Sequence, residues 1–204
     1  MLIGLVDIGI GNLGSLRSVL EKLNLNFRNC TENKDFENIE KILLPGVGNF
    51  AEFMEVLRSK SLDKTIIQKV NNRTPILGIC LGYQILFEES DEGVKTKGLG
   101  LLKGKFKSLD RVSKTIKVPH VGWNECSFKK KNNLFNGIPD KSDFYFTHTY
   151  YLDEHDHSDI ISETNYQINF TSAINKNNIY GVQFHPEKSQ KNGLKLLENF
   201  FNNC

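Results

Sequence analysis

Short apolar runs alternate with amphipathic helical stripes through the first hundred residues of this chain. The apolar runs at 2–6, 42–44 and 76–79 are nearly continuous, which is typical of strands buried on both faces. Between them, apolar residues recur every three or four positions, as from Leu13 to Leu23, and this spacing predicts helices. The order favours an α/β fold with a mostly parallel, open sheet and helices on both of its faces.

The pattern changes after residue 100, where strand-like runs follow one another with few helical stripes between them. These runs are 103–109, 115–118, 144–146, 170–174 and 179–184. We expect them to add antiparallel strands at one edge of the sheet, before a closing helix that contains Leu194 to Phe201. The 204 residues contain no repeat, low-complexity tract or linker, so we expect one domain over residues 1–204.

Charge and composition argue against several classes of function. Lysine and arginine (26 residues) nearly balance aspartate and glutamate (24 residues), so charge does not point to a nucleic-acid partner. No stretch approaches the ~18 apolar residues of a membrane span, and we expect no signal peptide. No two of the four cysteines have metal-ligand spacing, so we expect a reduced, cytoplasmic protein without a metal or cofactor.

The apolar run at 76–79 ends at Cys80, which is followed by Leu81, Gly82 and a helix-like segment at 83–88. This is typical of a sharp strand-to-helix turn that holds a side chain at the end of a sheet. The amino end of a helix carries free N–H groups, which favour the thiolate form of a nearby cysteine. Cys80 is therefore a candidate nucleophile, whereas we interpret Cys30, Cys126 and Cys204 as small apolar residues.

A histidine and a carboxylate follow the strand-like run at 179–184. His185 and Glu187 are two positions apart on an extended segment, so both side chains point the same way. A thiolate, an imidazole and an orienting carboxylate form the set that attacks a carbonyl carbon and protonates the leaving group. The glycine turn at 45–48 and the N–H of Leu81 are candidate donors to the oxyanion that such an attack creates.

A second motif points to a different function. The segment Gly9–Gly14 matches G-x-G-x-x-G after a strand, and Glu32 and Asp35 lie roughly where a ribose-binding carboxylate falls. Taken alone, it predicts a dinucleotide-binding protein. We favour a tight turn instead, with Asn12 as the N-cap of the following helix, because Asp7 would repel a pyrophosphate.

Several strings together resemble the class I (triad) glutamine amidotransferases. They are residues 78–84 around Cys80, the glycine turn 45–48 and the element 185–187. Four further strings, 7–12, 119–124, 145–150 and 181–189, make the chain similar to the glutaminase subunits of imidazole glycerol phosphate synthase. The resemblance extends from about residue 1 to residue 204 and implies a flavodoxin-like sheet with antiparallel edge strands.

The resemblance implies a role for each matching residue. Cys80 would form a glutamyl thioester, with His185 as general base and acid and Glu187 as its orienter. The oxyanion strand would comprise Gly46, Val47 and Gly48. The glutamine pocket would be lined by Gln84, Glu92, His148, Thr149 and Tyr150. The face toward a partner would comprise Pro119, His120, Val121, Gly122, Trp123, Asn124 and Lys188.

The resemblance also implies the reaction that the chain serves. Ammonia from L-glutamine would pass to a cyclase subunit, a (β/α)8 barrel, that makes imidazole glycerol phosphate and AICAR in histidine biosynthesis. A paralogous subunit that feeds an amino-sugar-modifying synthase remains an alternative. Tyr83 is a departure, because the family usually has methionine or an aliphatic residue beside the nucleophile.

Overall fold

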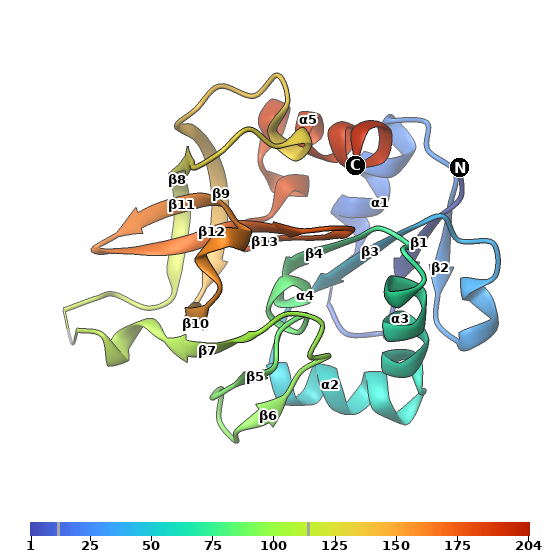
Figure 1. The fold of residues 1–204 in the computed structure, drawn as a ribbon, viewed down its shortest axis with the longest axis horizontal. Coiled ribbons are helices and arrows are strands. Elements are labelled where there is room, and N and C mark those ends of the chain that lie inside the picture. Colours follow the sequence, from blue (N-terminus) through green and yellow to red (C-terminus); the bar gives the residue numbers. More distant parts are fainter. Residues whose placement is uncertain (12, 114) are drawn as a thin grey trace.

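The computed structural model describes residues 1–11, 13–113 and 115–204, so the expected cap Asn12 lies outside the described residues. Within these ranges, nine strands form one twisted sheet (Figure 1). Its parallel half, in spatial order, comprises β2 (Phe27–Cys30), β1 (Ile3–Val6), β3 (Lys41–Gly46), β4 (Ile76–Cys80) and β13 (Ile179–Val182). Its antiparallel half continues from β13 with β12 (Ile168–Lys176), β11 (Ile160–Tyr166), β8 (His120–Phe128) and β9 (Ser142–His148). The expected α/β sheet with antiparallel strands at one edge is therefore confirmed.

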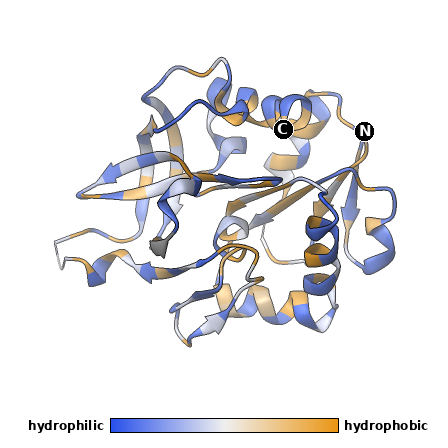
Figure 2. Ribbon diagram, viewed as in Figure 1, coloured by the Kyte–Doolittle hydropathy of each residue, from blue (hydrophilic) through white to orange (hydrophobic). Residues whose placement is uncertain are grey.

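Helices cover both faces of the parallel half (Figure 1). One face is covered by α1 (Gly14–Lys22) and α5 (Gln190–Asn203), and the other by α2 (Phe50–Ser59) and α3 (Leu62–Asn71). The apolar stripes of these helices pack against the strands in two separate core clusters, one on each face. Figure 2 shows hydrophobic residues concentrated on the central strands and on the helix surfaces turned toward them. In the described part of the chain, no helix is long and apolar enough to cross a membrane.

A second, smaller sheet lies beside the main one. It comprises β10 (Tyr150–His155), β7 (Gly104–Ser108), β5 (Glu89–Ser90) and β6 (Thr96–Lys97). The run at 103–109 therefore does not extend the main sheet, as the sequence suggested, but pairs with β10 and β5. Short 3₁₀ turns complete the structure: η1 (Asn33–Phe36), η2 (Leu109–Arg111), η3 (Asn133–Phe135), η4 (His157–Asp159) and η5 (Pro186–Lys188).

Two expected elements are wrong. The run at 115–118 is irregular, because Ile116 is its one buried side chain and no face is formed that could pack as a strand. The helix expected at 83–88 is instead the four-residue α4 (Leu81–Gln84). Beyond it, the carbonyl oxygens of Ile85, Leu86 and Phe87 accept N–H groups from residues 99–102. The segment at 98–102 thus takes the acceptors that a longer helix would need.

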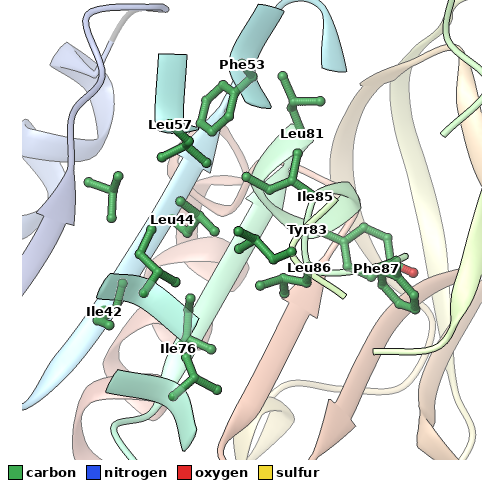
Figure 3. Close-up of a cluster of buried hydrophobic side chains, with 14 of the residues drawn as sticks. Ile42, Leu44, Phe53, Leu57, Ile76, Leu81, Tyr83, Ile85, Leu86 and Phe87 are labelled. Atoms are coloured by element: carbon green, nitrogen blue, oxygen red, sulfur yellow. The ribbon is translucent and has the colours of Figure 1, made fainter. Parts of the chain in front are cut away.

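Tyr83, the residue that departs from the family pattern, points into the core and not toward the end of the sheet. Its ring meets Phe87 and Phe106 edge-on, at centroid distances of 5.3 and 5.4 Å. It also fills the space left by Gly181, where any Cβ would overlap the ring. Figure 3 shows Tyr83 beside Leu86 and Phe87, in the cluster that also contains side chains of β3 and α2. The substitution therefore changes core packing behind the nucleophile.

The buried hydroxyl of Tyr83 gives a stability prediction. The side chain is 0% exposed, and the hydroxyl has no hydrogen-bond partner among the described residues. A buried, unpaired polar group costs about 1–3 kcal/mol. We expect Tyr83→Phe to stabilise the protein by about 1 kcal/mol, or ~2–4 °C in Tm, measured by urea and thermal unfolding. Tyr83→Ala is the matched control and should cost about 3–5 kcal/mol through the cavity it leaves. A clear loss of stability in Tyr83→Phe would show that the hydroxyl has a partner.

Candidate active site

Cys80 lies at a strained turn between β4 and α4. Its φ of 53° and ψ of −110° place a non-glycine residue in a region that costs of order 1–3 kcal/mol. The turn closes because its neighbours have no side chains: a Cβ on Gly78 would lie 2.6 Å from the Gly82 carbonyl oxygen. A Cβ on Gly82 would overlap the Leu44 carbonyl. The glycines thus allow the backbone to turn sharply enough to hold the thiol at the carboxyl end of the sheet.

His185 and Glu187 follow the neighbouring strand β13, and His185 lines the same cavity as Cys80. Nδ1 of His185 lies 2.7 Å from Oε1 of Glu187, and the turn that presents them is fixed by Ser189, whose hydroxyl donates to the His185 carbonyl at 2.6 Å. The backbone N–H of His185 also donates to the Tyr145 carbonyl at 2.8 Å. The carboxylate can only accept, so Nδ1 carries a proton and Nε2 is the nitrogen left for chemistry.

The imidazole of His185 is stabilised in its charged form. Burial by itself would lower its pKa, but the Cys80 thiolate and the Glu187 carboxylate outweigh burial and raise the pKa to about 10. Nε2 is buried and has no hydrogen-bond partner among the described residues. A protonated Nε2 at the cavity can therefore give its proton to a leaving group.

A cavity of about 240 Å³ opens at these two side chains. This is smaller than the ~300–1,000 Å³ of pockets for drug-sized ligands, so it suits a small metabolite. Its lining contains most of the predicted site: Val47, Gly48, Cys80, Leu81, Gln84, Glu92, His148, Thr149, Tyr150 and His185. Gly46 lies beneath this wall, paired with Cys80 in the β3–β4 register. The cavity thus brings together the predicted residues from five separate segments of the chain, and Pro119 adds a sixth.

Three residues at the cavity had no assigned pocket role from sequence. Pro119 and Thr147 line it, and Gln183 lies behind Cys80. The side-chain amide of Gln183 is 3.9 Å from the sulfur of Cys80 and accepts from Gln84 Nε2 at 3.2 Å. Gln183 is 1% exposed, and its Nε2 is the donor in the contact with the sulfur. The sequence contained a signal for Gln183, because it is a polar residue within the apolar run at 179–184. A buried side-chain amide needs a hydrogen-bond partner, so its presence there indicated a polar contact.

Glu92 brings a carboxylate to the far wall of the cavity. Its Oε2 accepts the N–H of Phe50 at 2.9 Å, at the first residue of α2. Burial raises its pKa, and the Phe50 hydrogen bond partly opposes this. A cation in the cavity would offset the cost of burying this charge. The position therefore suits a positively charged group of a ligand.

The residues expected at a partner face divide into two groups. Val121 and Trp123 on β8 are 55% and 48% exposed, and Pro119 and Lys188 are also exposed. His120 is 2% exposed, so its ring is not available to a partner. The strand explains the division, because successive side chains point to opposite faces and His120 points inward. Gly122 and Asn124 are half-buried between these extremes.

The glycine segment Gly9–Gly14 makes contacts within the protein that do not require a phosphate ligand. A Cβ on Gly11 would lie 2.5 Å from Cγ2 of Val47, so this glycine allows the turn to approach the cavity wall. The Asp7 carboxylate accepts the N–H of Gly9 at 3.0 Å and pairs with Arg17 at 2.6 Å. Asp35, a candidate for ribose binding, is already bonded to the N–H groups of Thr31 and Glu32. These contacts already use the Gly9 N–H and the Asp35 carboxylate.

The fold and this site define a class of protein. A family model described as glutamine amidotransferase class-I matches residues 4–204. The structure is similar to one titled "Structure of PurLQS from Thermotoga maritima", with a TM-score of 0.77 and 18% identity over 98% of this chain and 97% of that one. It is also similar to one titled "Crystal structure of glutamine amidotransferase", with a TM-score of 0.76 and 13% identity over 98% and 96%. At these identities the two structures support the fold alone.

Closer relatives narrow the class. The chain is 46% identical to "Imidazole glycerol phosphate synthase subunit HisH" of Methanocaldococcus jannaschii, over 98% of both chains. It is 43% identical to the subunit of the same name from Sulfurimonas denitrificans, over 98% of this chain and 97% of that one. The chain therefore belongs to the class I glutamine amidotransferase family, within the group of imidazole glycerol phosphate synthase HisH subunits.

Proposed function

We propose that this chain is the glutaminase subunit of an imidazole glycerol phosphate synthase, acting as one domain over residues 1–204. It hydrolyses L-glutamine to glutamate and ammonia, and a cyclase subunit uses the ammonia to make imidazole glycerol phosphate and AICAR. The proposal rests on one observation above all: Cys80 and His185 line one cavity, and Glu187 lies 2.7 Å behind the imidazole. The names of the relatives favour this synthase over one that modifies amino sugars.

The reaction begins from the thiolate and the imidazolium. The sulfur of Cys80 attacks the carboxamide carbon of glutamine, and the C–N bond breaks as His185 gives its Nε2 proton to the departing ammonia. This leaves a glutamyl thioester on Cys80. Neutral His185 then takes a proton from water, whose oxygen attacks the thioester to release glutamate and restore the thiolate. Glu187 accepts the hydrogen bond from Nδ1 throughout and so keeps that proton of His185 in place.

Backbone N–H groups bind the oxygen that becomes negative in each attack. The N–H of Leu81 follows the nucleophile directly, and those of Val47 and Gly48 belong to the opposite wall of the same cavity. Donors placed before the reaction stabilise such an oxyanion by about 3–4 kcal/mol each. Gly48, with a φ of 102°, gives that wall a backbone shape that few other residues adopt.

The amino-acid end of glutamine is recognised at the far wall. Glu92 pairs with the α-ammonium group, which offsets the burial of its carboxylate. The Thr149–Tyr150 backbone and Gln84 bound the remaining space and hold the carboxamide toward Cys80.

The partner docks on the face around the mouth of the cavity. Val47, Val118, Val121 and Trp123 are between 37% and 55% exposed, which is unusual for large apolar side chains. Lys188 Nζ lies 5.6 Å from the Tyr145 ring, so a charged group borders the apolar patch. A large aromatic side chain within an apolar patch is typical of an interface anchor. We propose that a (β/α)8 barrel cyclase covers this face and receives ammonia directly from the cavity.

Two measurements test the proposed function. Glutamate release is measured for the chain alone and with the cyclase of the same organism and its nucleotide; we expect turnover in the complex. A diazo-oxo analogue of norleucine, which mimics glutamine, is then mapped by peptide mass, and we expect it on Cys80 and blocked by glutamine. Cys30 and Cys126 are internal controls because they are 0% exposed. Copurification with an amino-sugar synthase instead of the cyclase would assign the chain to the paralogous reaction.

A further inference from the structure

Two histidines form a hydrogen-bonded pair behind the cavity wall. His120 on β8 and His148 on β9 are directly opposite each other in the antiparallel register. Nδ1 of His120 lies 2.9 Å from Nε2 of His148, and the two side chains are 2% and 5% exposed. His148 lines the cavity, whereas His120 lies one layer further from it. Burying a polar group without a hydrogen-bond partner costs free energy, so each nitrogen of these two buried imidazoles needs a partner.

The contacts of His148 determine which of its nitrogens carries the proton. Nδ1 is 2.9 Å from the carbonyl oxygen of Tyr150, and a carbonyl only accepts, so Nδ1 must donate. Burial lowers the pKa of His148 to about 3, and the nearby His120 and His185 act in the same direction. The ring is therefore neutral, Nε2 has no proton, and Nε2 accepts from Nδ1 of His120.

The same reasoning extends to His120. Its Nδ1 donates to His148, and burial lowers its pKa to about 4, so its Nε2 is an acceptor. That acceptor faces Nδ2 of Asn124 at 3.3 Å. The orientation of the amide is fixed independently, because its Nδ2 also donates to the Asn165 carbonyl at 2.9 Å. A directed line of hydrogen bonds thus runs from Asn124 on β8 through both rings to the Tyr150 carbonyl.

The plane of the His120 ring is also fixed. The ring is stacked between Phe146, at a centroid distance of 4.9 Å, and Tyr166, at 4.0 Å. The interplanar angles are 20° and 23°. A ring held on both faces aims its Nδ1–H in one direction, so its bond to His148 has little freedom. A phenylalanine ring at position 120 could stack in the same way. The stacking therefore does not explain why position 120 has a hydrogen-bond donor.

We propose that His120 and His148 are positioning residues of the glutamine pocket, which hold the Thr149–Tyr150 wall and connect it to β8. The inference rests on the proposed function of the cavity. His148 bonds to the Tyr150 carbonyl, and Thr149 and Tyr150 both line the cavity. On β8, the neighbours of His120 include the exposed Val121 and Trp123 of the proposed docking face. A shift of β8 on docking therefore reaches the pocket wall through two hydrogen bonds.

Two substitutions of His120 separate hydrogen bonding from stability. His120→Phe keeps an aromatic ring between Phe146 and Tyr166 but removes the donor to His148. His120→Asn loses the stack but keeps an N–H close to the position of Nδ1. In the complex with the cyclase, we expect KM for glutamine to rise about five- to tenfold in His120→Phe, with kcat changed less. We expect KM nearer the parent value in His120→Asn, although this variant melts at the lower temperature.

The decisive result is that KM and Tm rank the two variants in opposite orders: His120→Phe has the higher KM, and His120→Asn has the lower Tm. A KM in His120→Phe within twofold of the parent, or a KM that simply follows Tm, would overturn the inference. Synthesis from added ammonium salts should be unchanged in both variants, because it bypasses the pocket. An inactive parent would instead contradict the proposed function.

A spectroscopic measurement tests the pair even if neither variant folds. Nitrogen-15 shifts of the imidazoles in the parent protein should show both rings neutral, with the hydrogen on Nδ1. Free histidine in solution favours the hydrogen on Nε2, so this signature is distinctive. A proton on Nε2 of His148, or a charged ring at neutral pH, would contradict the line of hydrogen bonds.

Discussion

Cys80→Ala is expected to lower glutamine hydrolysis by about 10⁴-fold or more, because it removes the group that forms the thioester. The cyclase should still use ammonia supplied as an ammonium salt, since its chemistry does not need this site. The measurement is glutamate release and imidazole glycerol phosphate formation by the same complex with each nitrogen source. Retention of full glutaminase turnover would show that another nucleophile acts in the cavity.

The same variant makes a second, independent prediction about His185. The Cys80 thiolate is the largest of the influences that raise the pKa of this imidazole. Without it, burial opposes the charged form, and only Glu187 still supports it. We expect the pKa of His185 to fall in Cys80→Ala, measured by NMR titration of the ring. Cys204→Ala is the matched control, because it also removes a thiol but lies outside the cavity, and it should leave both turnover and this pKa unchanged.

Gly82→Ala is expected to destabilise the fold by about 3 kcal/mol or more, which is the high end for added volume in a packed core. A methyl group at this position would overlap the carbonyl of Leu44, and backbone atoms of β3 cannot rotate away as a side chain can. The turn after Cys80 must then move away from β3. We expect a lower urea midpoint, and loss of glutaminase activity in any protein that still folds.

A second glycine serves as a control for Gly82→Ala. It separates the steric overlap with the Leu44 carbonyl from the backbone strain that replacement of a glycine can cause. Gly93 has a φ of 68°, but a Cβ there would meet nothing within 4 Å. Gly93→Ala should therefore cost only about 1 kcal/mol, from backbone strain alone, and should leave hydrolysis intact. Equal stability losses in the two variants would mean that the space around Gly82 is not what holds the turn in place.

The central strands of the parallel half were predictable because they are buried at almost every position, whereas the edge strand β2 exposes two of its four residues. Strands such as β1 and β4 are buried at every position, so their apolar runs stand out in the sequence. The strand β8 did not stand out, because its pattern is inverted. Val121 and Trp123 are on its exposed side, whereas polar His120 is on its buried side. A strand that exposes apolar side chains and buries a polar one gives no signal of the usual alternation.

The antiparallel strand β11 was missed for a related reason. It buries Ser162 and Thr164, and the Ser162 hydroxyl lies 3.0 Å from that of Ser172 on β12. A hydroxyl is tolerated in a core only when such a partner exists, and the partner is ten residues away across the sheet. The local composition of residues 160–166 therefore indicated a polar segment, although pairing with β12 and β8 makes it a largely buried strand.

The candidate residues Cys80, His185 and Glu187 were recognisable from the sequence alone, because the glycines at 78 and 82 permit the sharp turn after β4. The extended segment expected at 185–187 is wrong: residues 186–188 form η5, and this turn brings Glu187 to within 2.7 Å of the His185 ring. Only the tertiary structure decided what surrounds them. Pairing of β13 with β4 brings His185 to Cys80, and pairing of β8 with β9 places two neutral histidines behind the pocket. Such strand pairings are stabilised by apolar surface that is buried between segments far apart in the chain. No single stretch of sequence therefore indicates which strands will pair.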